Sequence, residues 1–286
     1  MSPSRALLVL GMHRSGTSAI TRGVQALGVY LGDDFLSPQP DNPTGYWEDR
    51  NIYEINERLL GVFGLKWEDV AIIDGDQWQE PAVEALRDEA IEYLRSKFLG
   101  HPLWGFKDPR TIRLLPFWQP ILQSLGVDES YLLVIRNPHS VADSLMQRQG
   151  IDAITAHLLW LIYLVPNLPK IANRPFIVAD YDLFMADPCA QLERIANRLN
   201  ISLNDRSRVQ IEHFAKEFLD PALRHNFFDV SDFDRDLNLP PLSREAYLWL
   251  RSLATDRIPV DSPRFWTAWE KSREAVQRLI VGSTPA

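Results

Sequence analysis

Residues 11–18 have the types and the spacing of a phosphate-binding loop. The apolar run 7–10 precedes Gly11, and four residues separate Gly11 from Gly16. Glycines let backbone N–H groups approach an anion closely, and the N-terminus of a following helix adds further donors and a favourable dipole. We therefore expect an anion-binding cup formed by Gly11, His13, Arg14, Ser15, Gly16, Thr17 and Ser18.

One position of this loop differs from the loop of nucleoside triphosphatases. Thr17 stands where those loops carry the lysine that contacts the terminal phosphates, whereas Ser18 keeps the usual hydroxyl. Arg14, inside the loop, supplies a replacement cation. The loop is therefore predicted to bind phosphate without cleaving a triphosphate, which implies a different donor.

A second set of anion-binding residues follows the apolar run 131–135. Arg136 stands at the end of that run, and Ser144 comes two turns along the helix predicted from Pro138. An arginine and a hydroxyl make a sound phosphate clamp, because the planar guanidinium can donate to two oxygens at once. We expect Arg136 and Ser144 to share one anion.

Four short apolar runs are predicted to form the strands that position these residues. Each is followed by polar residues and then by a helical pattern, and together they cover residues 6–10, 102–106, 131–135 and 176–179. Continuous apolar character is typical of parallel strands covered by helices on both faces. We therefore predict an α/β fold with a P-loop-NTPase-like parallel sheet flanked by helices. Because ligands collect at the carboxyl ends of such strands, loops from three of them should surround one crevice.

The composition favours a single domain over residues 1–286. Hydrophobic residues make up 45% of the chain, enough for one large core, and no Pro-, Gly- or Ser-rich linker divides it. Residues 6–200 are predicted to form the nucleotide-binding α/β core and residues 200–286 a helical C-terminal extension. A helical repeat in this extension predicts the core-facing residues Tyr247, Leu248, Leu250 and Leu253.

Charge and cysteine content exclude several classes of protein. A net charge of −8 argues against nucleic-acid binding, which needs a broad basic face, so the partner anion must be small and locally held. Cys189 is the only cysteine, so neither a disulfide framework nor a cysteine-based zinc site is available. The N-terminus does not resemble a signal peptide, and the longest apolar run, 158–165, is shorter than the roughly 20 residues of a membrane span. We expect a cytoplasmic location, no metal site and no membrane span.

The two anion-binding motifs resemble those of sulfotransferases. Residues 11–18 are similar to the family's 5′-phosphosulfate loop, and Arg136-Asn137-Pro138 with Ser144 is similar to its 3′-phosphate motif. The similarity extends to the segments 104–110 and 181–188 and covers residues 6–200. The resemblance implies the donor 3′-phosphoadenosine 5′-phosphosulfate (PAPS), a hydroxyl compound as acceptor and no obligatory metal.

The chain also departs from the small-phenol members of that family. Arg14 stands in the place of their loop lysine, and their Gly-x-x-Gly-x-Trp-Lys segment is missing near the C-terminus. Residues 223–226 are either a replacement basic cap over the donor or a plain surface loop. Residues 45–48, Gly-Tyr-Trp-Glu, together with the Lys-Asp-Pro-Arg segment, are more similar to bacterial carbohydrate-directed sulfotransferases. This implies a sugar or glycoconjugate acceptor, whereas the aromatic residues of the loop would also suit a lipid, a phenol or a peptide tyrosine.

The chemistry of the transfer and the resemblance suggest roles for individual residues. Arg14 would stabilise the leaving phosphate, while Lys107 and Arg110 either hold the transferring group and the 5′-phosphate or pair with nearby acids. Glu48 ranks first as the base for the acceptor hydroxyl, because carbohydrate-type relatives use a carboxylate. The further candidates are Asp108, His139 and His13 as bases, with His139 and Asp49 also considered as helix caps.

Two other functions remain as alternatives. A P-loop kinase of small molecules would explain the loop geometry and the strand-end acid of the run 176–180, although Thr17 counts against it. A noncatalytic nucleotide-binding protein would keep the fold and the donor site without turnover. The acidic run 229–236 is predicted to be a solvated loop, since it lacks the glycine and terminal glutamate of a calcium loop.

Overall fold

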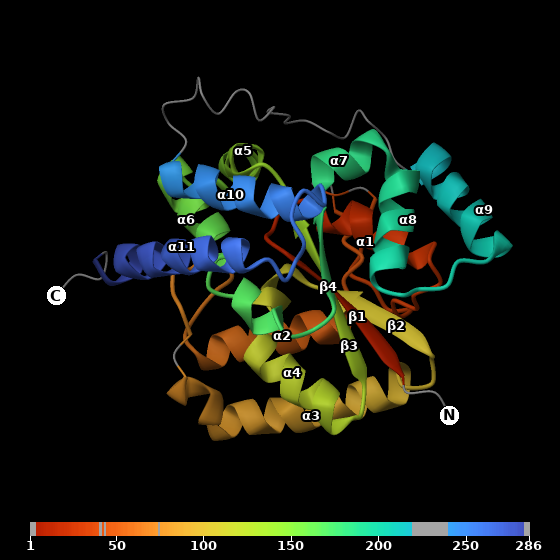
Figure 1. Cartoon of the computed structure of the whole chain (residues 1–286). Helices are drawn as coiled ribbons and strands as arrows, with labels where there is room; N and C mark the ends of the chain where they lie inside the picture. The colour runs from red at the N-terminus through yellow and green to blue at the C-terminus, as the bar shows by residue number, and fades with distance from the viewer. Residues whose placement is uncertain (1–3, 40–41, 43, 74, 219–239, 283–286) are drawn as a thin grey trace.

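The computed structural model describes residues 4–39, 42, 44–73, 75–218 and 240–282. Within them, four strands form one parallel sheet in the order β2-β1-β3-β4 (Figure 1). The strands are β1 (Arg5–Gly11), β2 (Leu103–Lys107), β3 (Asp128–Ile135) and β4 (Phe176–Asp180). All four predicted strands and the parallel α/β fold are confirmed. The segments 223–226 and 229–236 lie outside the described residues.

Helices fill the connections between the strands and the C-terminal part of the chain. The α-helices are α1 (Thr17–Gln25), α2 (Arg50–Val62), α3 (Pro81–Lys97), α4 (Leu115–Ser124), α5 (Pro138–Gln149), α6 (Ala153–Leu164), α7 (Tyr181–Ala186), α8 (Pro188–Arg198), α9 (Asp205–His213), α10 (Pro241–Ala254) and α11 (Pro263–Gly282). Shorter helical segments are η1 (Asp76–Gln79), η2 (Pro109–Ile112), η3 (Leu168–Ile171) and the π-helical η4 (Phe214–Phe218).

The sheet is covered on both faces, as its apolar strands require. Alternate side chains of β1 point to opposite faces: Leu7 and Val9 belong to a core shared with α1, α8 and α9, whereas Leu8 and Leu10 belong to a larger core shared with α2, α3 and α4. Figure 1 shows these two groups of helices on opposite sides of the sheet. Every loop at the carboxyl ends of the strands is thereby held between two packed layers.

The apolar run 158–165 forms part of α6, which is a core helix. The stretch Ala153–Ile171 is the one part of the described chain that is long and apolar enough to cross a membrane, and 67% of its apolar window is buried. Within it, Trp160 is fully buried and its Nε1 donates to the carbonyl of Arg136 at 3.3 Å. The predicted buried helix is confirmed, and it supports the turn that carries Arg136.

Asp49 caps the N-terminus of α2, as predicted. Its Oδ1 accepts hydrogen bonds from the backbone N–H groups of Asn51 and Ile52, each at 3.1 Å. The hydroxyl of Tyr93 donates to the same carboxylate at 2.7 Å. Because Glu48 immediately precedes this cap, the start of α2 fixes where the Glu48 side chain lies.

Removing this cap should cost stability. We expect Asp49→Ala to lower the free energy of unfolding by about 1–2 kcal/mol, because two helix N–H groups lose their acceptor. Asp49→Asn should cost less, since asparagine is also a good cap. Urea denaturation of both variants measures the difference, and equal stability of the alanine and asparagine variants would show that the cap contributes little.

The C-terminal helix α10 packs against β4 and α6. The hydroxyl of Tyr247 donates to Asp180 Oδ2 at 2.7 Å, and Tyr247, Leu250 and Leu253 are buried as predicted. Leu248 is 36% exposed, so its prediction as a core residue was wrong. The buried residues of α10, among them Ala246, Tyr247, Leu250 and Leu253, recur at a spacing of three and four, and Leu248 lies on the opposite side of the helix from the middle of this face.

Candidate active site

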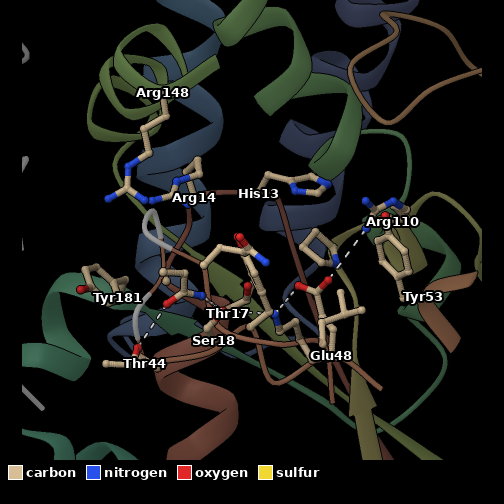
Figure 2. Close-up of a pocket in the computed structure, with 18 of the residues that line it drawn as sticks. His13, Arg14, Thr17, Ser18, Thr44, Glu48, Tyr53, Arg110, Arg148 and Tyr181 are labelled. Carbon is tan, nitrogen blue, oxygen red and sulfur yellow. Dashed lines mark hydrogen bonds and ion pairs between the residues drawn. The ribbon is translucent and has the colours of Figure 1, made fainter. Parts of the chain in front are cut away.

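A cavity of about 680 Å³ lies at the carboxyl ends of β1, β2 and β3. Figure 2 shows a close-up of the side chains that line it. The predicted site residues in its lining are His13, Arg14, Gly16, Thr17, Ser18, Glu48, Lys107, Arg110 and Arg136. Gly11, Ser15 and Ser144 are not part of the lining. The loops that the topology was expected to bring together therefore do surround one cavity.

The two loop glycines are required by geometry. A Cβ on Gly11, whose φ is +154°, would lie 2.6 Å from the carbonyl oxygen of Val134. A Cβ on Gly16, whose φ is +81°, would lie 2.0 Å from the ring of Tyr181. Gly16 is also the N-cap of α1 and has no side chain to satisfy the first N–H groups of that helix. The N-terminus of α1 therefore presents backbone donors and the positive end of its dipole to the cavity.

Arg14 connects the loop to α5. It adopts a left-handed conformation with φ of +66°, and its Nε donates to Ser144 Oγ at 3.0 Å. Arg136 Nη1 donates to the carbonyl of Arg14 at 3.2 Å, and the Arg136 guanidinium lies 4.8 Å from the ring centre of Tyr181. Arg136 and Ser144 are thus brought to one region, with Arg14 between them.

Arg148 was missed by the sequence analysis. It lines the same cavity from α5, one helical turn beyond Ser144. Figure 2 shows Arg148 and Arg14 on the same side of the cavity. Because residues four apart share a helix face, the spacing from Ser144 to Arg148 was a signal that could have identified it.

A buried ion pair joins the loop to the segment before α2. Lys107 Nζ donates to Glu48 Oε1 at 2.6 Å and to Ser18 Oγ at 3.2 Å. The side chains of Lys107 and Glu48 are only 1% and 8% exposed. Burial raises the pKa of Glu48, and the positive charge of Lys107 partly opposes this increase. Glu48 is the one carboxylate among the described lining residues, and Lys107 holds it beside the phosphate loop.

Arg110 is held in an acidic setting. Its Nη1 lies 3.0 Å from Asp108 Oδ1, its Nε donates to Glu57, and its guanidinium lies 4.7 Å from the ring centre of Tyr53. Although burial alone would lower it, the carboxylates of Asp108, Glu48 and Glu57 raise the pKa of Arg110 above its ordinary value. Both cations whose role the sequence left open, Lys107 and Arg110, therefore pair with acids and also line the cavity.

The other base candidates are less well placed than Glu48. Asp108 is fully buried, outside the cavity lining, and accepts from the backbone N–H of Arg110 at 2.7 Å. His139 is also outside the lining, and its prediction as a helix cap was wrong, because Asn137 caps α5 by accepting from the His139 N–H at 2.9 Å. The short Asn137 side chain reaches back to that N–H from the position before the helix.

His13 lines the cavity as an uncharged imidazole. Burial, followed by the charges of Arg110, Lys107 and Arg14, keeps its pKa well below the ordinary value. Its ring centre lies 4.3 Å from that of Trp67, a lining residue that no sequence pattern predicted. His13 therefore adds a neutral polar group to the cavity at neutral pH.

The cavity is locally basic although the chain is acidic overall. Among the residues that the structure describes, five arginines, one lysine and a single carboxylate line it, in a chain of net charge −8. These cations are Arg14, Arg50, Lys107, Arg110, Arg136 and Arg148. Such a concentration of guanidinium groups in a concave site favours a ligand with several negative charges.

The metal-site and kinase hypotheses both depend on where the acidic residues of the described chain lie. No group of three or more His, Cys, Asp or Glu residues in the described ranges could hold a metal ion. Asp180, the strand-end acid that favoured a kinase, caps α7 by accepting from the N–H groups of Asp182 and Leu183 at 2.9 and 3.1 Å. With Tyr247 on its other oxygen, Asp180 has a structural role.

Comparison with known proteins gives matches among solved structures. No protein-family model and no curated protein matches the chain. The sulfotransferase domain of the olefin synthase from Synechococcus PCC 7002 is 18% identical with a TM-score of 0.49, over 90% of this chain and 96% of that domain. Sulfotransferase STF1 from Mycobacterium tuberculosis H37Rv is 14% identical with a TM-score of 0.45, over 74% of this chain and 71% of that one. The sulfotransferase domain from the curacin biosynthetic pathway is 13% identical with a TM-score of 0.43, over 96% and 98% of the two chains. These structures belong to the family that the motifs resemble.

Proposed function

We propose that the protein is a sulfotransferase that moves a sulfuryl group from PAPS to a hydroxyl of a carbohydrate or glycoconjugate. The observation that carries this proposal is the cavity itself, in which six cations and the uncapped N-terminus of α1 converge in an otherwise acidic chain. We further propose that residues 1–286 act as one domain. With Cys189 free, the chain suits a reducing, cytoplasmic compartment.

The residues of the cavity fit the two anionic ends of this donor. The backbone N–H groups at the start of α1, with the hydroxyl groups of Thr17 and Ser18, suit a 5′-phosphosulfate. Arg136 and Arg148 lie on the side toward α5 and suit a 3′-phosphate, while Arg14, in the loop itself, keeps its proposed role at the leaving phosphate. A donor with two separated anionic groups uses both sets, whereas a single phosphate would use one.

The proposed transfer breaks the bond between sulfur and the bridging phosphate oxygen and forms a bond between sulfur and the acceptor oxygen. The bridging oxygen leaves with the electron pair, and the acceptor's proton passes to a base. Positioning and cationic stabilisation of spread charge dominate such transfers. Lys107 is 3.2 Å from Ser18 of the loop and can supply that stabilisation.

Glu48 is the proposed base for the acceptor hydroxyl. It is the lining carboxylate, and burial raises its pKa, which makes its ionised form a better proton acceptor. Tyr53 lines the cavity on the same side, as Figure 2 shows, and offers the flat apolar face that sugar rings pack against. These features support a carbohydrate as the acceptor.

The donor site can be tested by calorimetric titration with 3′-phosphoadenosine 5′-phosphate (PAP) and, separately, with ATP and magnesium. We expect selective binding of PAP, weakened by about 10- to 100-fold in Arg136→Ala because charge-assisted hydrogen bonds are lost. Arg58→Ala is the matched control, since Arg58 forms an exposed pair with Glu89 away from the cavity. Preference for ATP would favour the kinase, and PAP binding without transfer to any acceptor would favour a noncatalytic protein.

A further inference from the structure

The two sides of the cavity differ in their balance of charge. Figure 2 shows Arg14 and Arg148 on one side, and Arg110, Tyr53 and Glu48 on the other. The first side has Arg136 as a third cation, and no carboxylate lines it among the described residues. Three guanidinium groups therefore gather on this side, where a donor with several phosphates could contact them.

On the second side of the cavity, Lys107 and Arg110 form ion pairs with carboxylates. Lys107 forms its ion pair with Glu48 at 2.6 Å. Arg110 lies 3.0 Å from Asp108 and donates from Nε to Glu57. Two cations therefore face three carboxylates, and His13 adds no charge because its pKa is held well below the ordinary value. A ligand on this side meets no net positive charge.

Of the three carboxylates Glu48, Glu57 and Asp108, Glu57 is the one that is not buried in the core. Its side chain is 42% exposed on α2, whereas Asp108 is fully buried and Glu48 is 8% exposed. The Glu57 carboxylate accepts a hydrogen bond from Arg110 Nε. The same Arg110 guanidinium packs over the ring of Tyr53. Without the Glu57 charge, Arg110 would keep its contacts with Asp108, at 3.0 Å, and with Glu48, at 4.0 Å, and the cluster would hold two cations and two carboxylates.

Resting on the proposed function, we propose that Glu57 determines acceptor specificity by adding a third carboxylate beside Lys107 and Arg110, so that this side of the cavity takes uncharged hydroxyl compounds and excludes acceptors that carry a carboxylate or sulfate. An anionic acceptor would bring a further negative charge beside Glu48, Asp108 and Glu57, and like charges in a buried site repel strongly. An uncharged sugar with an apolar ring face avoids this repulsion and keeps the contact with Tyr53.

The test compares two probes that differ at one carbon, C6, which is an uncharged hydroxymethyl group in one and a carboxylate in the other. Phenyl β-glucoside and phenyl β-glucuronide have the same ring and aglycone, and binding of each is measured by calorimetry to protein saturated with PAP. The variant is Glu57→Gln, which removes the charge at a half-exposed position. The matched control is Glu89→Gln, because Glu89 has a similar exposure of 46% and pairs with Arg58 away from the cavity.

The expected result is tighter binding of the glucuronide by Glu57→Gln, by about tenfold, since the substitution removes the excess negative charge beside Arg110. Affinity for the glucoside should stay within about twofold, and the Glu89→Gln control should behave like the wild type. A Glu57→Gln protein that gains no affinity for the glucuronide overturns the proposal, as does a wild type that binds the glucuronide more tightly than the glucoside. Failure of PAP to bind in the first step overturns the proposed function instead, so the two failures are distinct.

Discussion

Replacing Glu48 with glutamine is expected to reduce sulfuryl transfer by about 10²- to 10⁴-fold, the usual effect of losing a general base. Glutamine keeps the size of the side chain but cannot accept the acceptor's proton. Affinity for PAP should stay within about twofold, because Glu48 pairs with Lys107 and has no contact with the arginines near α5. Transfer from radiolabelled PAPS to an accepted sugar measures the first quantity, and calorimetry measures the second.

Asp49→Asn is the matched control for this substitution. It makes the same chemical change one residue away in a buried carboxylate, which caps α2 and does not line the cavity. Its activity should be close to that of the wild type. Equal losses in Glu48→Gln and Asp49→Asn would show that the start of α2 is disturbed in both, and would contradict a role for Glu48 as the base.

The pH profile gives an independent measure of the same role. Burial raises the pKa of Glu48, while the facing charges of Lys107 and Arg110 lower it and Asp108 raises it. Because the base must be ionised, the rate should fall as the pH drops through a value above the ordinary pKa of glutamate, about 4.3. Lys107→Met removes the nearest cation and should move this acid limb to still higher pH. If the acid limb of the pH profile stays at the same pH in Lys107→Met, the titrating group is not Glu48.

Replacing Gly16 with alanine is expected to lower the free energy of unfolding by about 2–4 kcal/mol, from left-handed backbone strain plus a steric conflict. The new Cβ would lie 2.0 Å from the Tyr181 ring, so the ring or the loop must move. Either shift disturbs the N–H groups at the start of α1, and PAP affinity should fall by at least about tenfold. Urea denaturation and PAP titration measure the two effects.

The control variant Gly28→Ala separates the effect of left-handed backbone strain from the effect of the steric conflict with Tyr181. Gly28 has a φ of +90°, but nothing lies within 4 Å of the position its Cβ would take. This control should cost only the backbone strain, about 1–2 kcal/mol, and leave PAP binding unchanged. In a Tyr181→Ala background, Gly16→Ala should cost no more than Gly28→Ala. If Gly16→Ala is no more harmful than Gly28→Ala in the wild-type background, the contact with Tyr181 is not a constraint on the loop.

The elements were predictable because local patterns determine them. The strand-to-loop transition at Gly11 and the cap at Asp49 each depend on residues within one turn of the chain, and both are found in the structure. The crevice also followed from topology, since the carboxyl ends of parallel strands meet at one edge of a sheet. The prediction of Leu248 was wrong because the apolar repeat included one residue that lies outside the buried face of the helix.

The pairing of charges could not be predicted in the same way. Glu57 and Arg110 belong to segments far apart in the sequence, and no local rule states which acid will neutralise which base. The hydrogen bond from Arg14 to Ser144 likewise depends on how α5 packs beside the loop. Sequence patterns identified most of the charged groups of the site. Only the folded chain shows which of these groups pair with an opposite charge.

The position of β1 in the middle of the sheet has a consequence for folding. β1 precedes the other described strands in the chain and pairs on one edge with β2 and on the other with β3, so Arg5 lies opposite both Leu103 and Asp128. Long segments must be brought together before either edge is satisfied, and such non-local pairing makes folding slow. An incomplete chain would leave both edges of an apolar strand open to association with other chains. We therefore expect the sheet and the loop that follows β1 to form together, late in folding.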